Sequence, residues 1–194
     1  MELLKAKIRD EATVLPGRII KVDGFLNHRV DVSLMKELAK EFYRRFSRDS
    51  ITAIVTIEAS GIALATACAM EFNVPLIFAK KAKSDNIEGG LITSEVYSYT
   101  YHRKMTLLIN SQWLKESDRV LIIDDFLANG ESVRGLIEIL KYSGATVAGI
   151  GIAIEKGFKP GGKRLRELGY DVQSLVIIDD ASQEGIVFRD FDYD

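Results

Sequence analysis

The sequence predicts a single α/β domain in which helices cover both faces of a parallel sheet. From residue 52 onward, short apolar runs alternate with helical segments. This pattern is typical of strands that are buried on both faces and connected by helices. The chain has 194 residues, 47% of them hydrophobic, which is enough to bury one core. We therefore expect one domain over residues 1–194.

The expected elements follow in chain order. The first twelve residues mix charged and apolar positions and predict a short amphipathic helix, and residues 18–30 predict a strand that leads into an irregular loop. Residues 31–46 place apolar side chains at helical spacing behind a cap at Asp31 or Ser33. The sheet strands are predicted at 53–58, 75–80, 119–125, 146–156 and 171–178, with helices at 61–72, 131–144 and 161–169.

Residues 80–114 interrupt this alternation. Their first part is polar and contains the pair Gly89 and Gly90, while the second part carries two β-rich runs. We expect a mobile loop followed by a two-stranded ribbon. A long loop inside a compact domain is uncommon, and it is usually functional or disordered. The last residues, 189–194, are expected to form a loose tail.

The composition argues against several classes of protein. A net charge of −2 and a pI near 5.8 give no broad basic face, so we expect no nucleic-acid partner. Cys68 is the single cysteine, which argues against disulfides and cysteine metal sites, and its apolar helix face predicts a core position. No apolar stretch reaches the roughly 18 residues of a membrane span. We therefore expect a cytoplasmic protein with no membrane partner.

Two strand-to-helix junctions carry unusual residues, "VTIEASGIA" and "LIIDDFLANGESV". Ligands of parallel α/β sheets bind beyond the carboxyl ends of the strands. Each junction also enters a helix, whose first N–H groups and positive dipole end favour an anion. The two junctions therefore predict binding sites for two phosphate groups.

At the second junction, residues 128–130 are small or tolerant of left-handed backbone, so successive N–H groups can close around an anion, and Ser132 adds a hydroxyl. Asp124 and Asp125 cannot bind that anion. They can accept hydrogen bonds from two vicinal hydroxyls, such as those of a ribose. The alternative is that the two acids only cap the following turn.

The stretch "VLIIDDFLANGES" resembles the phosphoribosyl pyrophosphate signature of the type I phosphoribosyltransferases, which has four hydrophobic residues, two acids, a small loop with glycine, and a final Ser or Thr. "TIEASG" is similar to the family's pyrophosphate loop, "AKKAK" to its basic segment, and residues 82–111 to its flexible loop and ribbon. Together with "KVDGFLNH" and "IEKGFKPG", these motifs look most like the bacterial enzymes of this family that use xanthine. The resemblance covers most of the chain.

The resemblance implies a type I phosphoribosyltransferase fold, with a purine-binding hood from about residues 1–50 plus the C-terminal segment, and a core over about 51–180. It implies a glycosyltransferase (pentosyltransferase) of purine salvage. Xanthine and phosphoribosyl pyrophosphate would be its substrates, and xanthosine monophosphate and pyrophosphate its products. It also implies a homodimer, with Mg²⁺ bound through the substrate pyrophosphate rather than by dedicated protein ligands.

The same resemblance assigns site residues by motif. It implies that the donor phosphoribosyl pyrophosphate is bound by Ser60, Gly61, Lys81, Asp124, Asp125, Ala128, Asn129, Gly130, Glu131 and Ser132. Asp124, Asp125 and Lys81 are the expected catalytic residues. Ile20, Asn27 and Lys156 are the expected xanthine contacts, and Phe158 could stack on the ring. Lys156 can donate to a 6-oxo group but accepts nothing from a 6-amino group, which favours oxopurines.

Other interpretations stay open. Ala128 and Asn129 stand where many 6-oxopurine enzymes of the family have Asp and Thr, so the loop lacks that candidate base. Xanthine is the more acidic purine, and we expect the rate to follow its anionic fraction. The protein could prefer another purine, such as adenine, or be a non-catalytic regulator that senses a purine or the donor. Lys156 could be an ordinary solvated lysine, and Phe158 a packing residue.

Overall fold

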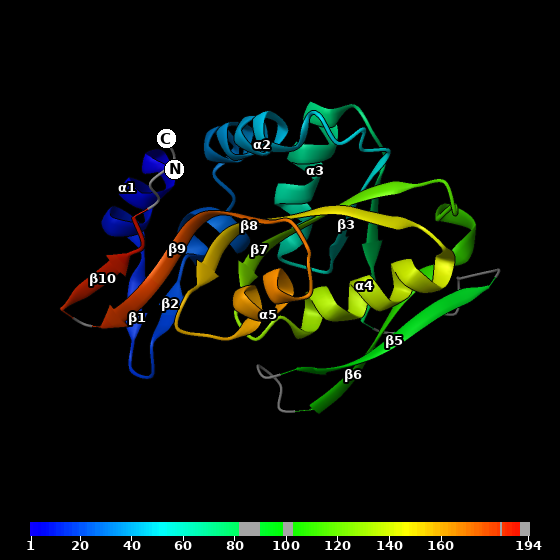
Figure 1. Cartoon of the computed structure of the whole chain (residues 1–194). Helices are drawn as coiled ribbons and strands as arrows, with labels where there is room; N and C mark the ends of the chain where they lie inside the picture. Colours follow the sequence, from blue (N-terminus) through cyan, green and yellow to red (C-terminus); the bar gives the residue numbers. More distant parts are fainter. Residues whose placement is uncertain (82–89, 99–102, 183, 191–194) are drawn as a thin grey trace.

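A six-stranded sheet forms the centre of the molecule in the computed structural model, which describes residues 1–81, 90–98, 103–182 and 184–190. The strand order is β10-β9-β8-β7-β3-β4 (Figure 1). All neighbouring pairs are parallel except β10 with β9, which is antiparallel. The strands are β3 (Ala53–Ile57), β4 (Leu76–Ala79), β7 (Arg119–Leu127), β8 (Thr146–Lys156), β9 (Val172–Ser182) and β10 (Gly185–Phe188).

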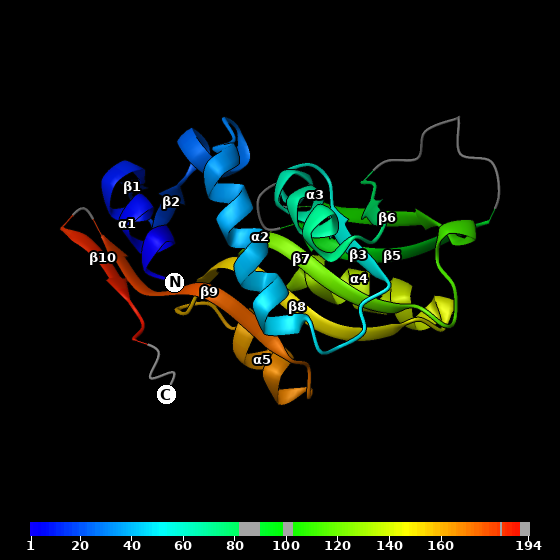
Figure 2. The same cartoon turned by 90° about the horizontal axis from the view of Figure 1, so that it is seen from above.

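Helices cover both faces of this sheet, as the sequence predicts. Helices α2 (Val32–Phe46) and α3 (Gly61–Phe72) lie on one face, and α4 (Glu131–Ser143) and α5 (Gly161–Glu167) lie on the other (Figures 1 and 2). Of the two candidate caps of α2, Asp31 is the one used, because its Oδ1 accepts a hydrogen bond from the N–H of Leu34 at 3.1 Å. The α/β prediction is confirmed.

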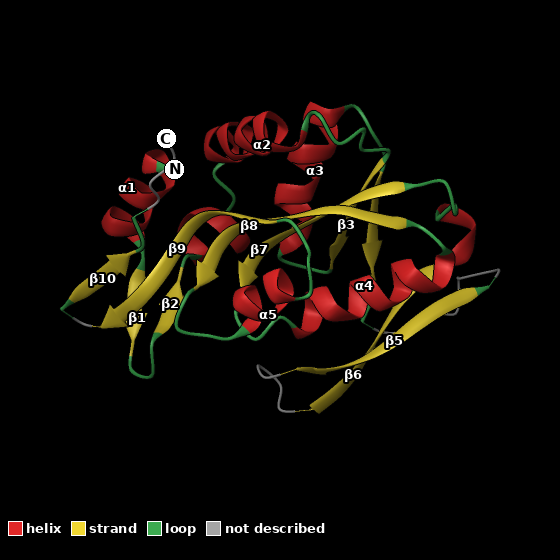
Figure 3. Ribbon diagram, viewed as in Figure 1, coloured by secondary structure: helices red, strands yellow, loops and turns green. Residues whose placement is uncertain are grey.

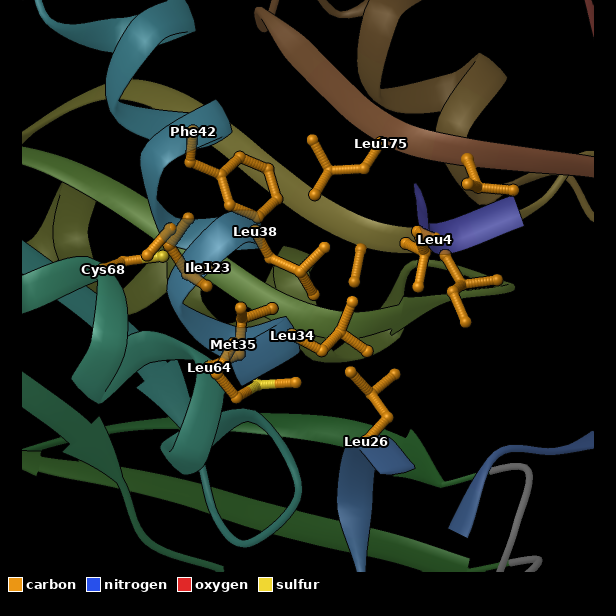
Figure 4. Packing of buried hydrophobic residues seen from close by; sticks show 14 of the residues in the cluster. Leu4, Leu26, Leu34, Met35, Leu38, Phe42, Leu64, Cys68, Ile123 and Leu175 are labelled. Atoms are coloured by element: carbon orange, nitrogen blue, oxygen red, sulfur yellow. The ribbon is translucent and has the colours of Figure 1, made fainter. Parts of the chain in front are cut away.

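The core on the α2 and α3 side is built from side chains that the helical spacing predicted. Leu38, Phe42, Cys68 and Ile123 are all fully buried there and pack together (Figure 4). Gly149 and Gly151 of β8 make room for this packing. A Cβ atom on Gly151 would lie 2.6 Å from Ile123 Cδ1 and 2.8 Å from Phe42 Cε1. Glycine at this position therefore lets α2 approach β8 closely.

The N-terminal segment lies at the β9 and β10 end of the sheet (Figure 1). It consists of α1 (Glu2–Glu11), the antiparallel pair β1 (Thr13–Leu15) and β2 (Ile19–Lys21), and the short π-helix η1 (Asp23–Asn27). The terminal amino group of Met1 donates to the carbonyl oxygen of Leu175 on β9 at 2.8 Å. This contact and the buried side chains of α1 fix the segment to the sheet.

The predicted ribbon is also present. Strands β5 (Leu91–Ser98) and β6 (Arg103–Asn110) pair along their whole length in antiparallel register, and the 3₁₀ turn η2 (Ser111–Trp113) follows them. The ribbon packs beside α4 (Figure 3). The expected mobile loop falls mostly on residues 82–89, which lie outside the described residues. Of the expected loose tail, residues 189–194, only Arg189 and Asp190 are described, and the N–H of Arg189 donates to the carbonyl oxygen of Ile177 on β9 at 2.8 Å.

Three short elements were missed in the sequence. Strands β1 and β10 are not predicted from sequence, because three or four residues are too few for a clear alternation. The segment predicted as an irregular loop after residue 21 contains the regular π-helix η1.

Among the helices of the described residues, none is long and apolar enough to cross a membrane.

Candidate active site

A cleft of about 550 Å³ opens at the carboxyl ends of β3, β7 and β8. Because parallel strands end at the same edge of a sheet, the loops that follow them meet there. Most of the predicted site residues line this cleft, namely Ile20, Asn27, Ser60, Lys81, Asp124, Asp125, Ala128, Asn129, Gly130, Glu131, Ser132 and Lys156. Gly61 lies behind the lining, and Phe158 is not part of it.

Asp125 connects two segments of the cleft through its carboxylate. Its side chain is 4% exposed, and each carboxylate oxygen accepts one hydrogen bond from a different segment. Asn27 Nδ2 of η1 donates to Oδ2 at 3.0 Å, and Ser60 Oγ, just before α3, donates to Oδ1 at 3.0 Å. Since a carboxylate has about four acceptor positions, both oxygens can still accept further donors.

Asp124 is equally buried but less connected. It is 6% exposed, and its Oδ1 accepts from the N–H of Asp125 at 3.0 Å. Burial, and next the neighbouring charge of Asp125, raise the pKa of Asp124 well above its usual range. A Cβ atom on Gly61 would lie 2.8 Å from Asp124 Oδ1 and 2.2 Å from Thr56 Oγ1. Gly61 therefore leaves the space that the Asp124 carboxyl occupies.

Residues 128–132 comprise the turn that follows β7 and the first two residues of α4. Gly130 precedes the helix with φ +84°, a left-handed conformation that favours glycine. Among the described residues, no side chain caps the first N–H groups of α4, which leaves them available to an anion. The Glu131 carboxylate accepts from Arg134 Nη2 at 2.9 Å, so its negative charge is balanced next to this turn. The turn suits a phosphate group.

Helix α5 supports this turn from behind. Gly161 N donates to Ala128 O at 2.9 Å, and a Cβ atom on Gly161 would lie 2.4 Å from that oxygen and 2.7 Å from Gly130 N. The helix is in turn held by Arg166, which donates to both oxygens of the buried Glu155 carboxylate at 2.8 and 2.7 Å. This contact is not predictable from the sequence, because nothing local relates Gly161 to residues 128–130.

The first junction and the end of β4 are also connected. Glu58 Oε1 accepts from the backbone N–H of Lys81 at 2.6 Å, and the peptide bond between Glu58 and Ala59 is cis. The bond between Glu58 and Lys81 brings the predicted basic segment next to the predicted pyrophosphate loop. Lys81 thus lines the same cleft as Ser60. The Lys81 side chain and the N-termini of α3 and α4 therefore face the same cleft.

The predicted base side contains one residue that the sequence analysis missed. Phe126 follows the two acids on β7 and lines the cleft, and Lys156 Nζ lies 5.3 Å from the centre of its ring. Burial, and next the charge of Lys159, lower the pKa of Lys156. The ring of Phe158 instead faces Arg18, whose guanidinium carbon lies 5.3 Å from its centre. Stacking of a base on Phe158 remains a prediction, and Phe126 is a second candidate for that contact.

Comparison with known proteins gives relatives along nearly the whole chain. The family described as "Phosphoribosyl transferase domain" matches residues 22–181. A protein of Lachnoclostridium phytofermentans named "Xanthine phosphoribosyltransferase" is 50% identical over 191 residues, which cover 97% of this chain and 98% of that protein. A protein of the same name from Stutzerimonas stutzeri is 50% identical over 190 residues, covering 98% of this chain and 100% of that protein.

Solved structures of lower identity share the fold. The adenine phosphoribosyltransferase of Thermoanaerobacter pseudethanolicus superposes with a TM-score of 0.74 at 20% identity and covers 91% of this chain and 98% of its own. The adenine phosphoribosyltransferase of Trypanosoma brucei, solved with AMP, pyrophosphate and ribose-5-phosphate, gives a TM-score of 0.76 at 22% identity, covering 90% and 79%. At this level of identity the similarity concerns the fold alone.

Proposed function

Because this chain belongs to the phosphoribosyltransferase family, we propose that it transfers the 5-phosphoribosyl group of phosphoribosyl pyrophosphate to xanthine. The products would be xanthosine monophosphate and pyrophosphate. The observation that carries the proposal is the cleft itself, in which two buried acids, an uncapped helix N-terminus and the neighbouring side chains of Phe126 and Lys156 meet. Its volume of about 550 Å³ lies within the usual range of small-ligand sites.

On the donor side, the turn at residues 128–132 supports binding of the 5′-phosphate, because its N–H groups and the α4 dipole favour negative charge. Asp124 and Asp125 would accept hydrogen bonds from the ribose hydroxyls. Ser60, Gly61 and Lys81 would bind the pyrophosphate group. With the sugar held at both ends, its C1 carbon would be fixed in position relative to the base.

The reaction breaks the bond between C1 and the pyrophosphate oxygen, whose electron pair leaves with pyrophosphate, and forms a bond from a ring nitrogen of xanthine to C1. The base loses a proton from a nitrogen to water, because Ala128 offers no side-chain base. Positive charge develops on the sugar and negative charge on the leaving group, so the site must stabilise separated charges and needs no covalent nucleophile. Lys81 and the first N–H groups of α3 would stabilise the leaving group. The buried Asp125 carboxylate would stabilise the sugar.

On the base side, Lys156 would donate to an oxo group, and Asn27 would contact the ring edge opposite. Ile20 and Phe126 supply apolar surface at the same cleft. The lowered pKa of Lys156 still leaves a donor nitrogen in either protonation state. Because the solved structures of adenine enzymes are similar only at 20 to 22% identity, they give no argument for adenine. The 50% identical relatives support xanthine.

The donor set of the cleft fits Mg²⁺ that arrives with the donor. Mg²⁺ takes oxygen ligands and is usually held by one or two carboxylates together with substrate phosphates, and Asp124 and Asp125 supply carboxylate oxygens beside the predicted pyrophosphate loop. When bound, the ion would neutralise charge on the pyrophosphate. We also propose a single catalytic domain over residues 1–194 that works as a cytoplasmic homodimer. Sedimentation analysis would test the oligomeric state.

The direct test offers xanthine, guanine, hypoxanthine and adenine separately, with phosphoribosyl pyrophosphate and Mg²⁺, and measures the nucleotide formed. The proposal expects the highest kcat/KM with xanthine. Turnover led by adenine would keep the chemistry and refute the base assignment. Donor binding without turnover on any base would assign the protein to the regulators.

A further inference from the structure

The purine side and the ribose side of the cleft are joined by one hydrogen bond. Asn27 Nδ2 donates to Asp125 Oδ2 at 3.0 Å, although the two residues are 98 positions apart in the chain. Asn27 is the last residue of η1, and the preceding Phe25 and Leu26 are 0% and 1% exposed. These two buried side chains anchor the π-helix in the core, so Asn27 is presented to Asp125 by a fixed segment.

The chemistry of the pair defines how the amide is used. An ionised carboxylate only accepts hydrogen bonds, so the NH₂ group of Asn27 must face Asp125, and its carbonyl oxygen is left to accept from another donor. The second carboxylate oxygen takes the hydroxyl of Ser60 at 3.0 Å. Two donors from two separate segments thus fix the orientation of the carboxylate of Asp125, a residue that is only 4% exposed.

We infer that Asn27, beyond its expected contact with the base, is a positioning residue for Asp125, and that affinity for the donor depends on Asn27 even when no base is bound. The inference rests on the proposed function, in which Asp125 accepts a hydrogen bond from the ribose. The Asn27 amide then has two separate tasks. Its NH₂ group orients the ribose acceptor, and its carbonyl oxygen accepts from an N–H of the base.

Two substitutions separate these tasks from simple packing. Asn27→Ala removes the donor and leaves a buried carboxylate oxygen without this partner, and loss of a hydrogen bond to a charged group corresponds to roughly a tenfold change in affinity. Asn27→Asp keeps the size and shape of the side chain but replaces the donor by a second carboxylate. Because two acids then face each other, the loss of donor affinity should be at least as large.

The matched control, Arg29, lies two residues after the π-helix η1 and contacts it. Arg29 Nη1 donates to Gly24 O at 3.2 Å and is exposed, so Arg29→Ala loosens η1 at its surface without removing the bond from Asn27 to Asp125. If general loosening of η1 were the cause of any effect, this variant would show it too. The thermal unfolding midpoint of each variant, measured alongside, gives the folded fraction.

The experiment is calorimetric titration of the full chain with phosphoribosyl pyrophosphate and Mg²⁺ in the absence of any base. We expect donor Kd to rise about tenfold in Asn27→Ala, at least as much in Asn27→Asp, and to stay at the wild-type value in Arg29→Ala. Wild-type donor affinity in both Asn27 variants, with only the KM for xanthine raised, would overturn the inference, as would an equal loss in Arg29→Ala. Failure of the proposed function is distinct, because the wild-type protein itself would then either not bind the donor or bind it without turnover on any base.

Discussion

Replacement of Gly161 by alanine tests whether α5 holds the phosphate-binding turn in place. A Cβ atom on Gly161 would lie 2.4 Å from Ala128 O, 2.7 Å from Asn129 C and 2.7 Å from Gly130 N. All three are backbone atoms of the turn, so no side chain can rotate away to make room. Either the turn or the start of α5 must move.

The size of the effect follows from these distances. Ordinary van der Waals contact begins near 3.4 Å, so the atoms that now lie 2.4 Å from the Cβ position must move by roughly 1 Å. Overpacking of this kind costs about 1 to 3 kcal/mol of stability. A misplacement of about 1 Å at a site that positions a substrate can cost on the order of 100-fold in rate. We therefore expect kcat/KM for the donor to fall by about 100-fold.

The assay measures initial rates of pyrophosphate release against donor concentration at saturating xanthine, with the unfolding midpoint recorded in parallel. Gly24→Ala is the matched control, since a Cβ atom there meets nothing within 4 Å and its φ is not in the left-handed region. We expect this control to retain wild-type kinetics. A folded Gly161→Ala protein with unchanged kcat/KM for the donor would refute the role assigned to α5.

Four further expectations concern charge. Asp125→Asn keeps the fold but removes an anion from the cleft, so turnover should fall by at least about 100-fold in the pyrophosphate assay; residual activity near wild type would contradict the role of Asp125. Asp124→Asn should raise the unfolding midpoint, because the raised pKa of Asp124 makes the folded state hold a proton that the unfolded chain releases, and the wild type loses stability as pH rises. This gain in the unfolding midpoint should disappear below pH 3.8, the ordinary pKa of Asp. A gain that does not depend on pH would contradict the expected protonation of Asp124. Burial alone would raise the pKa of Glu155, but hydrogen bonds from Arg166 and Ser174 outweigh it and lower the pKa, so the ion pair stabilises the protein above the ordinary value of 4.5 and is lost as pH falls below it. Glu155→Gln should lower the free energy of unfolding, measured with denaturant at neutral pH, by about 2 kcal/mol, a loss that is limited because Arg166 is partly screened by water. The difference in unfolding free energy between this variant and the wild type should become smaller in acid. Since Ala128 offers no side-chain base, the rate should follow the anionic fraction of xanthine in a pH series, and a flat profile across xanthine ionisation would reject this mechanism.

The strands and helices of the core were predictable because their signals are local. The apolar run before Asp124 defines β7, and the small residues at 128–130 define the turn that follows it. The carboxyl ends of the parallel strands lie at one edge of the sheet, so the residues predicted to bind phosphoribosyl pyrophosphate come together there. The β10 strand gave no such signal, because its four residues are recognised only through their pairing with β9.

Contacts between distant segments were not predictable in the same way. The bond between Asn27 and Asp125 depends on how a π-helix in the first 30 residues packs against the sheet. The approach of Gly161 to the turn depends on the length of the β8 to α5 connection. Phe126 could have been predicted as a contact of the base, because it follows two site residues at the end of one strand. Phe158 was predicted instead because it lies in the motif "IEKGFKPG".

The most direct measurement is a crystal structure of the protein with its two proposed products, xanthosine monophosphate and pyrophosphate. We predict the 5′-phosphate on the N–H groups of residues 128–132, the ribose hydroxyls on Asp124 and Asp125, and the base between Phe126 and Asn27 with an oxo group on Lys156. A nucleotide bound outside this cleft, or one whose ribose hydroxyls do not contact the two acids, would contradict the proposed site.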